Sequence, residues 1–294
     1  LRNHYTFVLA NTFEKMYFYG RNNGSGKTTW NFGQKPYEYT PPLGFLPLAS
    51  HNLESASILK PQRFFDTVLW TGNGGTSQTV TGLEFKPDFV WIKGRSGTSW
   101  HRLQNSVVGA NKLLYSNSTN AEATNEPNGY VSSFTDDGFV LADPDGNGGG
   151  VNSSGDNFVA WCWKAGGDSN TFNVDGVGYA TASAAGIAEG SISLTGASIN
   201  KTSRFSIVSY TGNSTDGATV GHGLGVEPSF VIIKSRNLGT VGSAGAHWSV
   251  SHKNLAGGLN GGNSAKKVYL SLSNAESPNN HGSISAASST TVTF

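Results

Sequence analysis

An internal duplication constrains this chain more than any other feature. Residues Phe65–Asn73 return as Phe205–Asn213, 140 positions later, and Pro87–Arg95 returns as Pro228–Arg236 at an offset of 141. A solenoid repeat spans roughly 20 to 50 residues, so a repeat of this length corresponds to a whole domain. The chain is therefore modular, and we expect Phe89 and Phe230 to occupy equivalent core positions in two like folds.

The two copies do not end alike. Further along, the offset between matching residues grows to 154: Lys112 matches Lys266, Tyr115 matches Tyr269, and Asn120–Glu122 matches Asn274–Glu276. The first copy then continues to the strand-like run Phe158–Trp163, which has no counterpart in the second copy. A sandwich without this strand would have an open edge and an exposed core. We therefore expect the polypeptide to continue past Phe294, or another chain to cover the gap.

Short strand-like runs dominate the sequence. Phe89–Ile92, Phe205–Tyr210 and Phe230–Ile233 are rich in aromatic and β-branched residues, and turn dipeptides such as Asn73-Gly74 and Asp137-Gly138 separate runs of this kind. Many short strands with regular turn signals are typical of antiparallel sandwiches. The predicted fold class is all-β, with tandem antiparallel β-sandwich modules of the lectin-like, jelly-roll type.

Composition and repeat boundaries divide the chain into four parts. Residues 1–62 form an aromatic, proline-containing segment, 63–168 the first β-sandwich repeat, 169–203 a Gly/Ala/Ser-rich connection, and 204–294 the second repeat, incomplete at its C-terminus. Cys162 is the single cysteine, which excludes an internal disulfide. It lies in the strand-like run Phe158–Trp163, which predicts a buried and inert thiol.

The charge content excludes some classes of partner. The net charge is +1, and charged residues make up 13% of the chain, against an ordinary value of about 25%. Scattered Lys and Arg residues give no footprint for phosphate-backbone binding, so no nucleic-acid partner is predicted. No apolar run reaches the roughly 18 residues of a membrane span. Polar surfaces with many tight turns are typical of extracellular or virion all-β proteins.

Two short motifs resemble ligand-binding loops. Gly24–Thr28 lacks the spacing of a phosphate-binding loop and precedes a strand-like run, so the sequence favours a glycine-rich turn. Asp143, Asp145 and Asn147 stand at positions one, three and five of a calcium loop, but position twelve is Ser154, where a bidentate Glu is needed. Calcium at these three residues and a polar loop of Asx turns both remain open; no other cofactor is predicted.

Aromatic and histidine residues recur at similar positions of the two copies. Trp100 and His101 in the first copy correspond in place to His247 and Trp248 in the second. Aromatic faces attract sugars and protein partners, which makes these four residues candidate ligand-binding residues. Structural aromatics filling each core are the alternative. No nucleophile, metal or acid/base motif occurs in the sequence, and the protein is predicted not to be an enzyme.

The residues also resemble a known group of proteins. Asn31–Phe45 resembles the closing stretch of SPRY-like, concanavalin-type sandwich domains of bacteriophage structural proteins. Thr71–Gly74, Phe85–Lys93 and Asn157–Gly166 resemble the duplicated modules that follow such domains in phage tail fibres and related virion appendages, notably of marine phages. On this resemblance, residues 1–62 are the C-terminal part of a SPRY-like sandwich that lacks its upstream strands, and the chain is a segment of a longer fibre protein.

The resemblance implies a virion location, on the tail or capsid surface and extracellular after release. The expected function is attachment to a host-surface glycan or protein through multivalent contacts, alongside other virion proteins, in a homo-oligomer for which a trimer is preferred. The alternatives are a self-assembling structural protein, such as a capsid decoration or filament subunit, and a polysaccharide depolymerase. A depolymerase would need two carboxylates about 5 to 10 Å apart.

Overall fold

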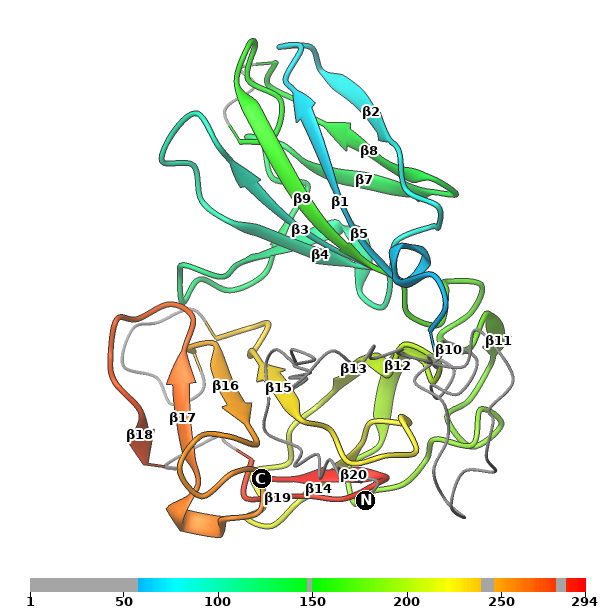
Figure 1. The fold of residues 1–294 in the computed structure, drawn as a ribbon, viewed down its shortest axis with the longest axis vertical. Coiled ribbons are helices and arrows are strands. Elements are labelled where there is room, and N and C mark those ends of the chain that lie inside the picture. Colours follow the sequence, from blue (N-terminus) through cyan, green and yellow to red (C-terminus); the bar gives the residue numbers. More distant parts are fainter. Residues whose placement is uncertain (1–57, 147–149, 239–245, 279–283) are drawn as a thin grey trace, which may run out of the picture. The chain divides into compact units, whose positions relative to one another are not determined.

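The protein folds into β-strands joined by turns. Its structure, a computed structural model, describes residues 58–146, 150–238, 246–278 and 284–294. The sequence-based assignments for most of residues 1–62, including Gly24–Thr28, lie outside these ranges. The described helices are two 3-10 turns, η2 (Pro61–Arg63) and η3 (Gly262–Ser264), and no described helix is long and apolar enough to cross a membrane. The predicted all-β class is confirmed (Figure 1).

The first module is a sandwich of two sheets. One sheet has the strand order β1-β9-β3-β4-β5-β6 and the other has the order β2-β8-β7. All pairings within both sheets are antiparallel. The strands are β1 (Phe65–Thr71), β2 (Ser77–Thr81), β3 (Phe89–Gly94), β4 (Arg102–Asn105), β5 (Gly109–Tyr115), β6 (Ala123–Thr124), β7 (Tyr130–Thr135), β8 (Gly138–Ala142) and β9 (Asn157–Trp163).

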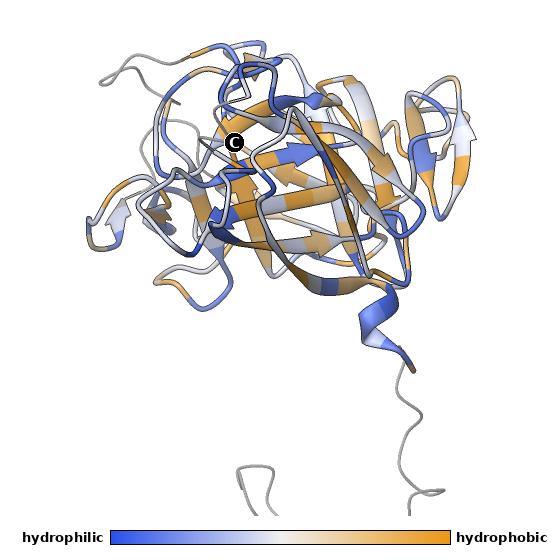
Figure 2. Cartoon of the chain, turned by 90° about the horizontal axis from the view of Figure 1, so that it is seen from above, coloured by the Kyte–Doolittle hydropathy of each residue, from blue (hydrophilic) through white to orange (hydrophobic). Residues whose placement is uncertain are grey.

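Alternation along the strands builds the core of the first module. Successive side chains of a strand point to opposite faces, so every second residue is buried. Hydrophobic and hydrophilic residues accordingly alternate along many strands (Figure 2). Strand β9 lies between β1 and β3, and its Phe158, Ala160 and Cys162 are buried in the core. Burial raises the pKa of the Cys162 thiol, which confirms the expectation of a buried cysteine.

The Gly/Ala/Ser-rich segment 169–203 contains three strands of its own: β10 (Phe172–Val174), β11 (Val177–Tyr179) and β12 (Leu194–Asn200). Strand β12 pairs with the first strand of the second repeat, β13 (Phe205–Tyr210), and β10 pairs with β12 in parallel. Ala197 and Ile199 of β12 are fully buried. This segment is therefore part of the sheet structure of the second module, and β10 with β12 is the one parallel pair among the described strands, beside an isolated parallel bridge between Ile192 and Val220.

The second module repeats the strand order of the first. The order β14-β20-β19 matches β2-β8-β7, and the order β15-β16-β17-β18 matches β3-β4-β5-β6. The duplicated sequence therefore folds as duplicated strands. The bounds are β14 (Thr219–Gly221), β15 (Phe230–Ile233), β16 (Ser249–His252), β17 (Lys266–Tyr269), β18 (Ser277–Pro278), β19 (Ala286–Ala287) and β20 (Thr291–Thr293).

One strand of the first module, β9, has no counterpart among the described strands of the second. In the first module β9 joins β1 to β3, whereas no described strand joins β13 to β15 in the second. Phe230 begins β15 as Phe89 begins β3, so the two residues hold equivalent strand positions. Phe230 is nevertheless 54% exposed and Phe89 is only half-buried, so the expectation of equivalent core positions is wrong. Phe89 packs on Trp163 of β9, with ring centroids 5.2 Å apart, whereas no described strand takes the place of β9 beside Phe230.

Direct contacts join the two modules. The Arg236 guanidinium donates to both carboxylate oxygens of Glu122, at 2.6 and 2.8 Å. The buried Trp248 donates its indole N–H to the Tyr115 carbonyl at 2.8 Å. Tyr115 ends β5 and Glu122 lies in the segment that follows it, so the second module holds this region of the first module in place.

Candidate functional site

A hollow of about 450 Å³ lies where β4 begins and β5 ends. Trp100 precedes β4, Arg102 is its first residue, and Tyr115 is the last residue of β5. Arg102 and Tyr115 are directly opposite in the antiparallel register, which places both side chains on the same face of the sheet. The full lining is Ser99, Trp100, Arg102, Tyr115, Asn120, Glu126 and Asn128.

Aromatic rings form one side of this hollow. Trp100 is 47% exposed, and its ring meets Tyr115 edge to face, with centroids 5.0 Å apart and an interplanar angle of 84°. Tyr115 is buried, and Trp248 holds its carbonyl from the second module. The exposed indole is therefore supported by a fixed partner ring and keeps surface free for a ligand.

A buried arginine forms the floor. Arg102 is 5% exposed and donates from its two terminal nitrogens to the carbonyls of Gly150, at 2.8 Å, and Asn128, at 3.3 Å. Its guanidinium carbon lies 5.6 Å from the centroid of the Tyr115 ring. Burial lowers the pKa of the Arg102 guanidinium, against the opposing effect of Tyr115 and of the carboxylates of Glu126 and Asp143.

Polar side chains complete the hollow. Asn120, Asn128 and Glu126 contribute amide and carboxylate groups beside the rings. Burial raises the pKa of the Tyr115 phenol, with Arg102 opposing that shift. An apolar ring face beside a few convergent hydrogen-bonding groups is suited to a sugar, since a sugar ring presents C–H groups on its face and hydroxyls at its rim.

The structure separates the four aromatic and histidine candidates. Trp100 alone of these lines the hollow. His101 accepts the Trp91 indole N–H at its Nδ1, at 3.0 Å, and burial followed by the charge of Lys93 lowers its pKa. Trp248 is buried at the contact between the modules. His247 packs on Tyr269 with centroids 5.2 Å apart, which repeats the Trp100–Tyr115 pair in the second module.

The calcium candidates lie in the turn after β8. Asp143 is fully buried, and its backbone N–H donates to the Thr76 carbonyl at 2.9 Å. Asp145 is exposed, and Asn147 lies outside the described residues. Across the described ranges, no group of three or more His, Cys, Asp and Glu side chains is placed to hold a metal ion. The backbone bond from Gly146 to the Asp143 carbonyl, at 3.1 Å, forms a turn of the polar-loop type.

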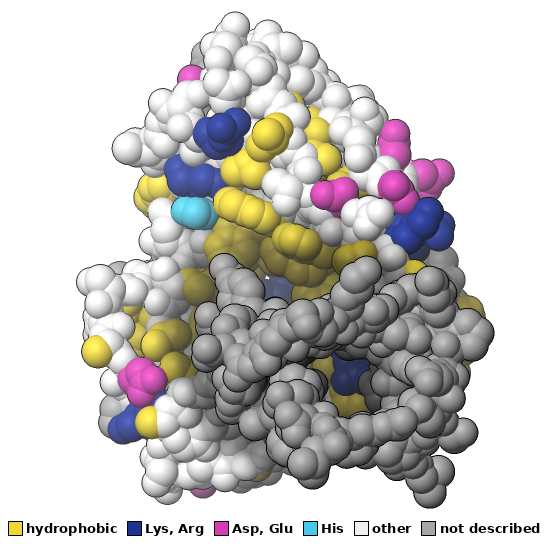
Figure 3. All heavy atoms as spheres, viewed as in Figure 1, with side chains coloured by type: hydrophobic (Ala, Val, Ile, Leu, Met, Phe, Trp, Pro, Cys, Tyr) yellow, Lys and Arg dark blue, Asp and Glu magenta, His cyan; other side chains and the backbone are white. Residues whose placement is uncertain are grey.

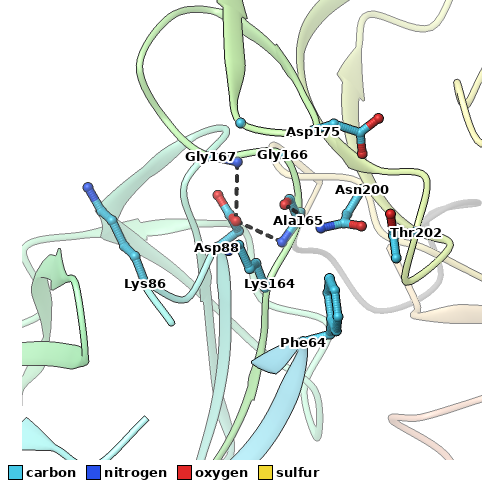
Figure 4. Close-up of a pocket in the computed structure, with 11 residues that line it drawn as sticks. Phe64, Lys86, Asp88, Lys164, Ala165, Gly166, Gly167, Asp175, Asn200 and Thr202 are labelled. Carbon is cyan, nitrogen blue, oxygen red and sulfur yellow. Dashed lines mark hydrogen bonds between the residues drawn. The ribbon is translucent and has the colours of Figure 1, made fainter. Parts of the chain in front are cut away.

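A second hollow, of about 310 Å³, surrounds Asp88, which is 3% exposed (Figure 4). Oδ1 of Asp88 accepts from the hydroxyls of Ser106, at 2.8 Å, and Ser198, at 3.1 Å. Oδ2 accepts from the backbone N–H groups of Ala165, at 2.7 Å, and Gly167, at 3.3 Å. Burial raises the Asp88 pKa, and these four hydrogen bonds oppose the shift.

Asp88 therefore fixes the first module to the segment that follows it. Ser198 belongs to β12, and Ala165 and Gly167 follow β9, so one carboxylate joins three parts of the chain. Sequence reasoning did not find this residue. A signal was present, because the position 141 residues later holds Ser229, a departure from the repeat at a charged residue.

Among the described side chains on the face drawn in Figure 3, Lys and Arg occur in small groups, and Asp and Glu are gathered mainly at one side.

Residues 60–294 match the family described as domain of unknown function (DUF7483). The chain belongs to this family. No curated protein and no solved structure matches the chain. The family's match begins before β1 and includes both modules and the segment between them, consistent with the contacts that join these parts.

Proposed function

We propose that this chain is part of a phage virion appendage that attaches to a host-surface glycan, and that a sugar binds in the hollow beside Trp100. The observation that carries the proposal is the half-exposed Trp100 ring, braced by Tyr115 and surrounded by amide, carboxylate and guanidinium groups. The resemblance of the duplicated modules to those of tail fibres supports the virion location.

Binding of this kind is weak for one site and strong for several. A stacked aromatic ring contributes on the order of 0.5–1.5 kcal/mol beyond burial. Linking several copies in one oligomer makes later contacts intramolecular and raises the overall affinity without new contacts. We therefore propose a homo-oligomer, with a trimer preferred, in which each copy presents one such hollow to the cell surface.

The proposed action is recognition without catalysis. Glycoside hydrolysis uses a pair of carboxylates on either side of the scissile bond. Glu126 is the one carboxylate among the residues that line this hollow. Incubation of a bound glycan with the protein should release no shorter saccharide, and released fragments would show that the protein is a depolymerase.

A glycan array followed by titration tests the proposal. The oligomeric protein should give signal on a restricted set of bacterial surface glycans, and Trp100→Ala should weaken binding of the best hit by about tenfold, as loss of roughly 1.4 kcal/mol implies. Phe230→Ala is the matched control, because Phe230 is an equally exposed aromatic residue outside the hollow. A silent array, or equal affinity for Trp100→Ala and wild type, would contradict the proposal.

A further inference from the structure

One wall of the hollow beside Trp100 comes from a loop. Residues 116–122 join β5 to β6, and Asn120 of this loop lines the hollow. Within the loop, the Ser118 N–H donates to the Tyr115 carbonyl at 3.2 Å, and the Ser118 hydroxyl accepts the Asn120 N–H at 3.1 Å. A loop is more mobile than the strands that it joins. The position of Asn120 therefore depends on what holds the loop from outside.

The second module holds this loop on both sides of Asn120. One residue earlier, the Thr119 carbonyl accepts from the Lys234 ammonium at 3.3 Å. Two residues later, Glu122 donates its backbone N–H to the Arg236 carbonyl at 2.7 Å. The Glu122 carboxylate also accepts both hydrogen bonds from the Arg236 guanidinium. The residue that lines the hollow thus lies between two anchors on the second module.

Burial makes these anchors effective. Thr119 is 8% exposed, and the side chain of Glu122 is 10% exposed. A two-point bond between a guanidinium and a sheltered carboxylate fixes distance and angle together. Burial lowers the Lys234 pKa, and its ammonium also donates to the carbonyls of Ser235, at 2.7 Å, and Leu238, at 3.2 Å. Lys234 therefore ties the loop after β15 to the loop after β5.

The duplication provides an internal comparison for the loop. Asn120–Glu122 precedes β6, and the matching Asn274–Glu276 precedes β18. All three residues of the second copy are exposed, whereas Ala121 and Glu122 of the first are half-buried. Nearly the same local sequence is packed more deeply in the copy that meets the other module. The contact between the modules, rather than the local sequence, accounts for this packing.

The second module carries a different side chain at the floor of the corresponding site. Arg102 lies opposite Tyr115 in the register of β4 and β5, and Ser249 lies opposite Tyr269 in the register of β16 and β17. Ser249 is therefore the equivalent of Arg102. The second copy keeps the tyrosine and replaces the guanidinium by a hydroxyl.

The residues before Ser249 have also changed their task. His247 stands where the first module has Trp100, and Trp248 stands where it has His101. Trp248 is buried and donates its indole N–H to the Tyr115 carbonyl, next to the hollow of the first module. The second copy thus uses its tryptophan to hold the first.

We propose that the second module positions the Trp100 hollow, with Lys234, Arg236 and Trp248 holding the loop 116–122 and the end of β5 in the shape that binds the glycan. This inference rests on the proposed function and gives the two copies different tasks: the first binds, and the second holds the binding surface. The three side chains are positioning residues that act through the loop. Holding the loop before the glycan arrives lowers the ordering cost of binding and so raises affinity.

Hydrogen exchange of the glycan-free protein, measured by NMR, tests the positioning directly. Arg236→Ala should quicken exchange at the Ser118 and Asn120 amides at least tenfold, because the acceptors of both amides lie in the first module and report the shape of the loop. Lys253→Ala, at an exposed cation of the second module, is the matched control and should leave both rates unchanged. Unchanged rates in Arg236→Ala, or equal quickening in Lys253→Ala, would overturn the proposal.

Titration with the array glycan that gives the strongest wild-type signal tests the consequence for binding. Arg236→Ala should weaken affinity at least fivefold while keeping the wild-type thermal unfolding curve, and Arg236→Lys, which retains the charge, should recover part of the loss. Weaker binding by Trp100→Ala with unchanged binding by Arg236→Ala would overturn the positioning role and leave the proposed function standing. Wild-type affinity in Trp100→Ala, or a silent array, would overturn both.

Discussion

The two modules share a strand order but differ in one strand, and the difference shows what that strand does. With β9 present, the facing residues of β1 and β3 are buried, and β9 adds Phe158 stacked on Trp70, with centroids 5.4 Å apart. In the second module, where no described strand takes this place, the residues of β13 and most of β15 are half-buried and Phe230 is exposed. A strand that lies between two others completes the hydrogen bonding and the core together.

The modules also differ in how they join their neighbours. Asp88 binds four donors around the end of β9, whereas the equivalent Ser229 is exposed, and its backbone carbonyl accepts the Lys253 N–H at 3.0 Å. Ser106 makes the same backbone bond to Asp88 at 2.8 Å. The duplicated backbone contact is retained in both modules, and the buried carboxylate occurs only where a third segment must be fixed.

The largest expected effect tests the contribution of β9. Phe158→Ala should lower the free energy of unfolding by about 3–5 kcal/mol, since it removes a large buried ring and leaves a cavity. Phe230→Ala should change it by less than about 0.5 kcal/mol, because more than half of that side chain is already exposed. Chemical denaturation measures both, and similar losses for the two variants would refute the contrast between the modules.

A smaller effect tests the hydrogen bonds that the Asp88 carboxylate accepts from the segments around it. Asp88→Asn replaces an acceptor with an amide that faces donors, and should cost on the order of 2–3 kcal/mol because buried donors lose their partner. Ser229→Ala, the equivalent change in the second module, should be nearly neutral. Amide exchange at Ala165 and Gly167 should quicken in Asp88→Asn, and unchanged exchange there would show that the carboxylate does not hold this turn.

The smallest effect concerns pH and the second module. His222 is 6% exposed, accepts the Leu224 N–H at Nδ1, and has a pKa lowered mainly by burial. In the unfolded chain this histidine has its ordinary pKa of about 6.5, so below that pH the unfolded chain binds more protons than the folded protein. The free energy of unfolding should therefore be highest above that pH and should fall as the pH drops through the lower pKa that His222 has in the folded protein.

Unfolding curves at several pH values between 8 and 5 measure this dependence. His222→Gln should flatten the pH dependence, because it removes the titrating imidazole. A slope that persists in His222→Gln would assign the effect to another group.

Much of the fold could be predicted from the sequence because it depends on local patterns. Alternation in Phe89–Ile92 and turn residues such as Asp137-Gly138 indicate strands and hairpins, and the 140-residue repeat indicates like folds. Segment 169–203 shows where this fails. Its small residues resemble a linker, yet β12 is a buried strand because β10 and β13 cover its edges.

The candidate site was only partly predictable. Trp100 was visible as a recurring aromatic, but Arg102 and Tyr115 are brought to it by the register of β4 and β5, which no local pattern gives. His247 and Trp248 were equal candidates in the sequence. In the structure His247 packs on the Tyr269 ring, and Trp248 donates to the Tyr115 carbonyl at the contact between the modules. Residue type therefore indicated the chemistry, and packing selected the residue that could use it.

The sequence by itself determined the all-β class and the duplication, because strand periodicity, turn chemistry and repeat order are all features of the linear chain. Tertiary structure alone decided which aromatic side chain stays exposed and that Asp88 holds three segments together. These depend on residues far apart in the chain, whose burial and pairing are set only when the sheets pack.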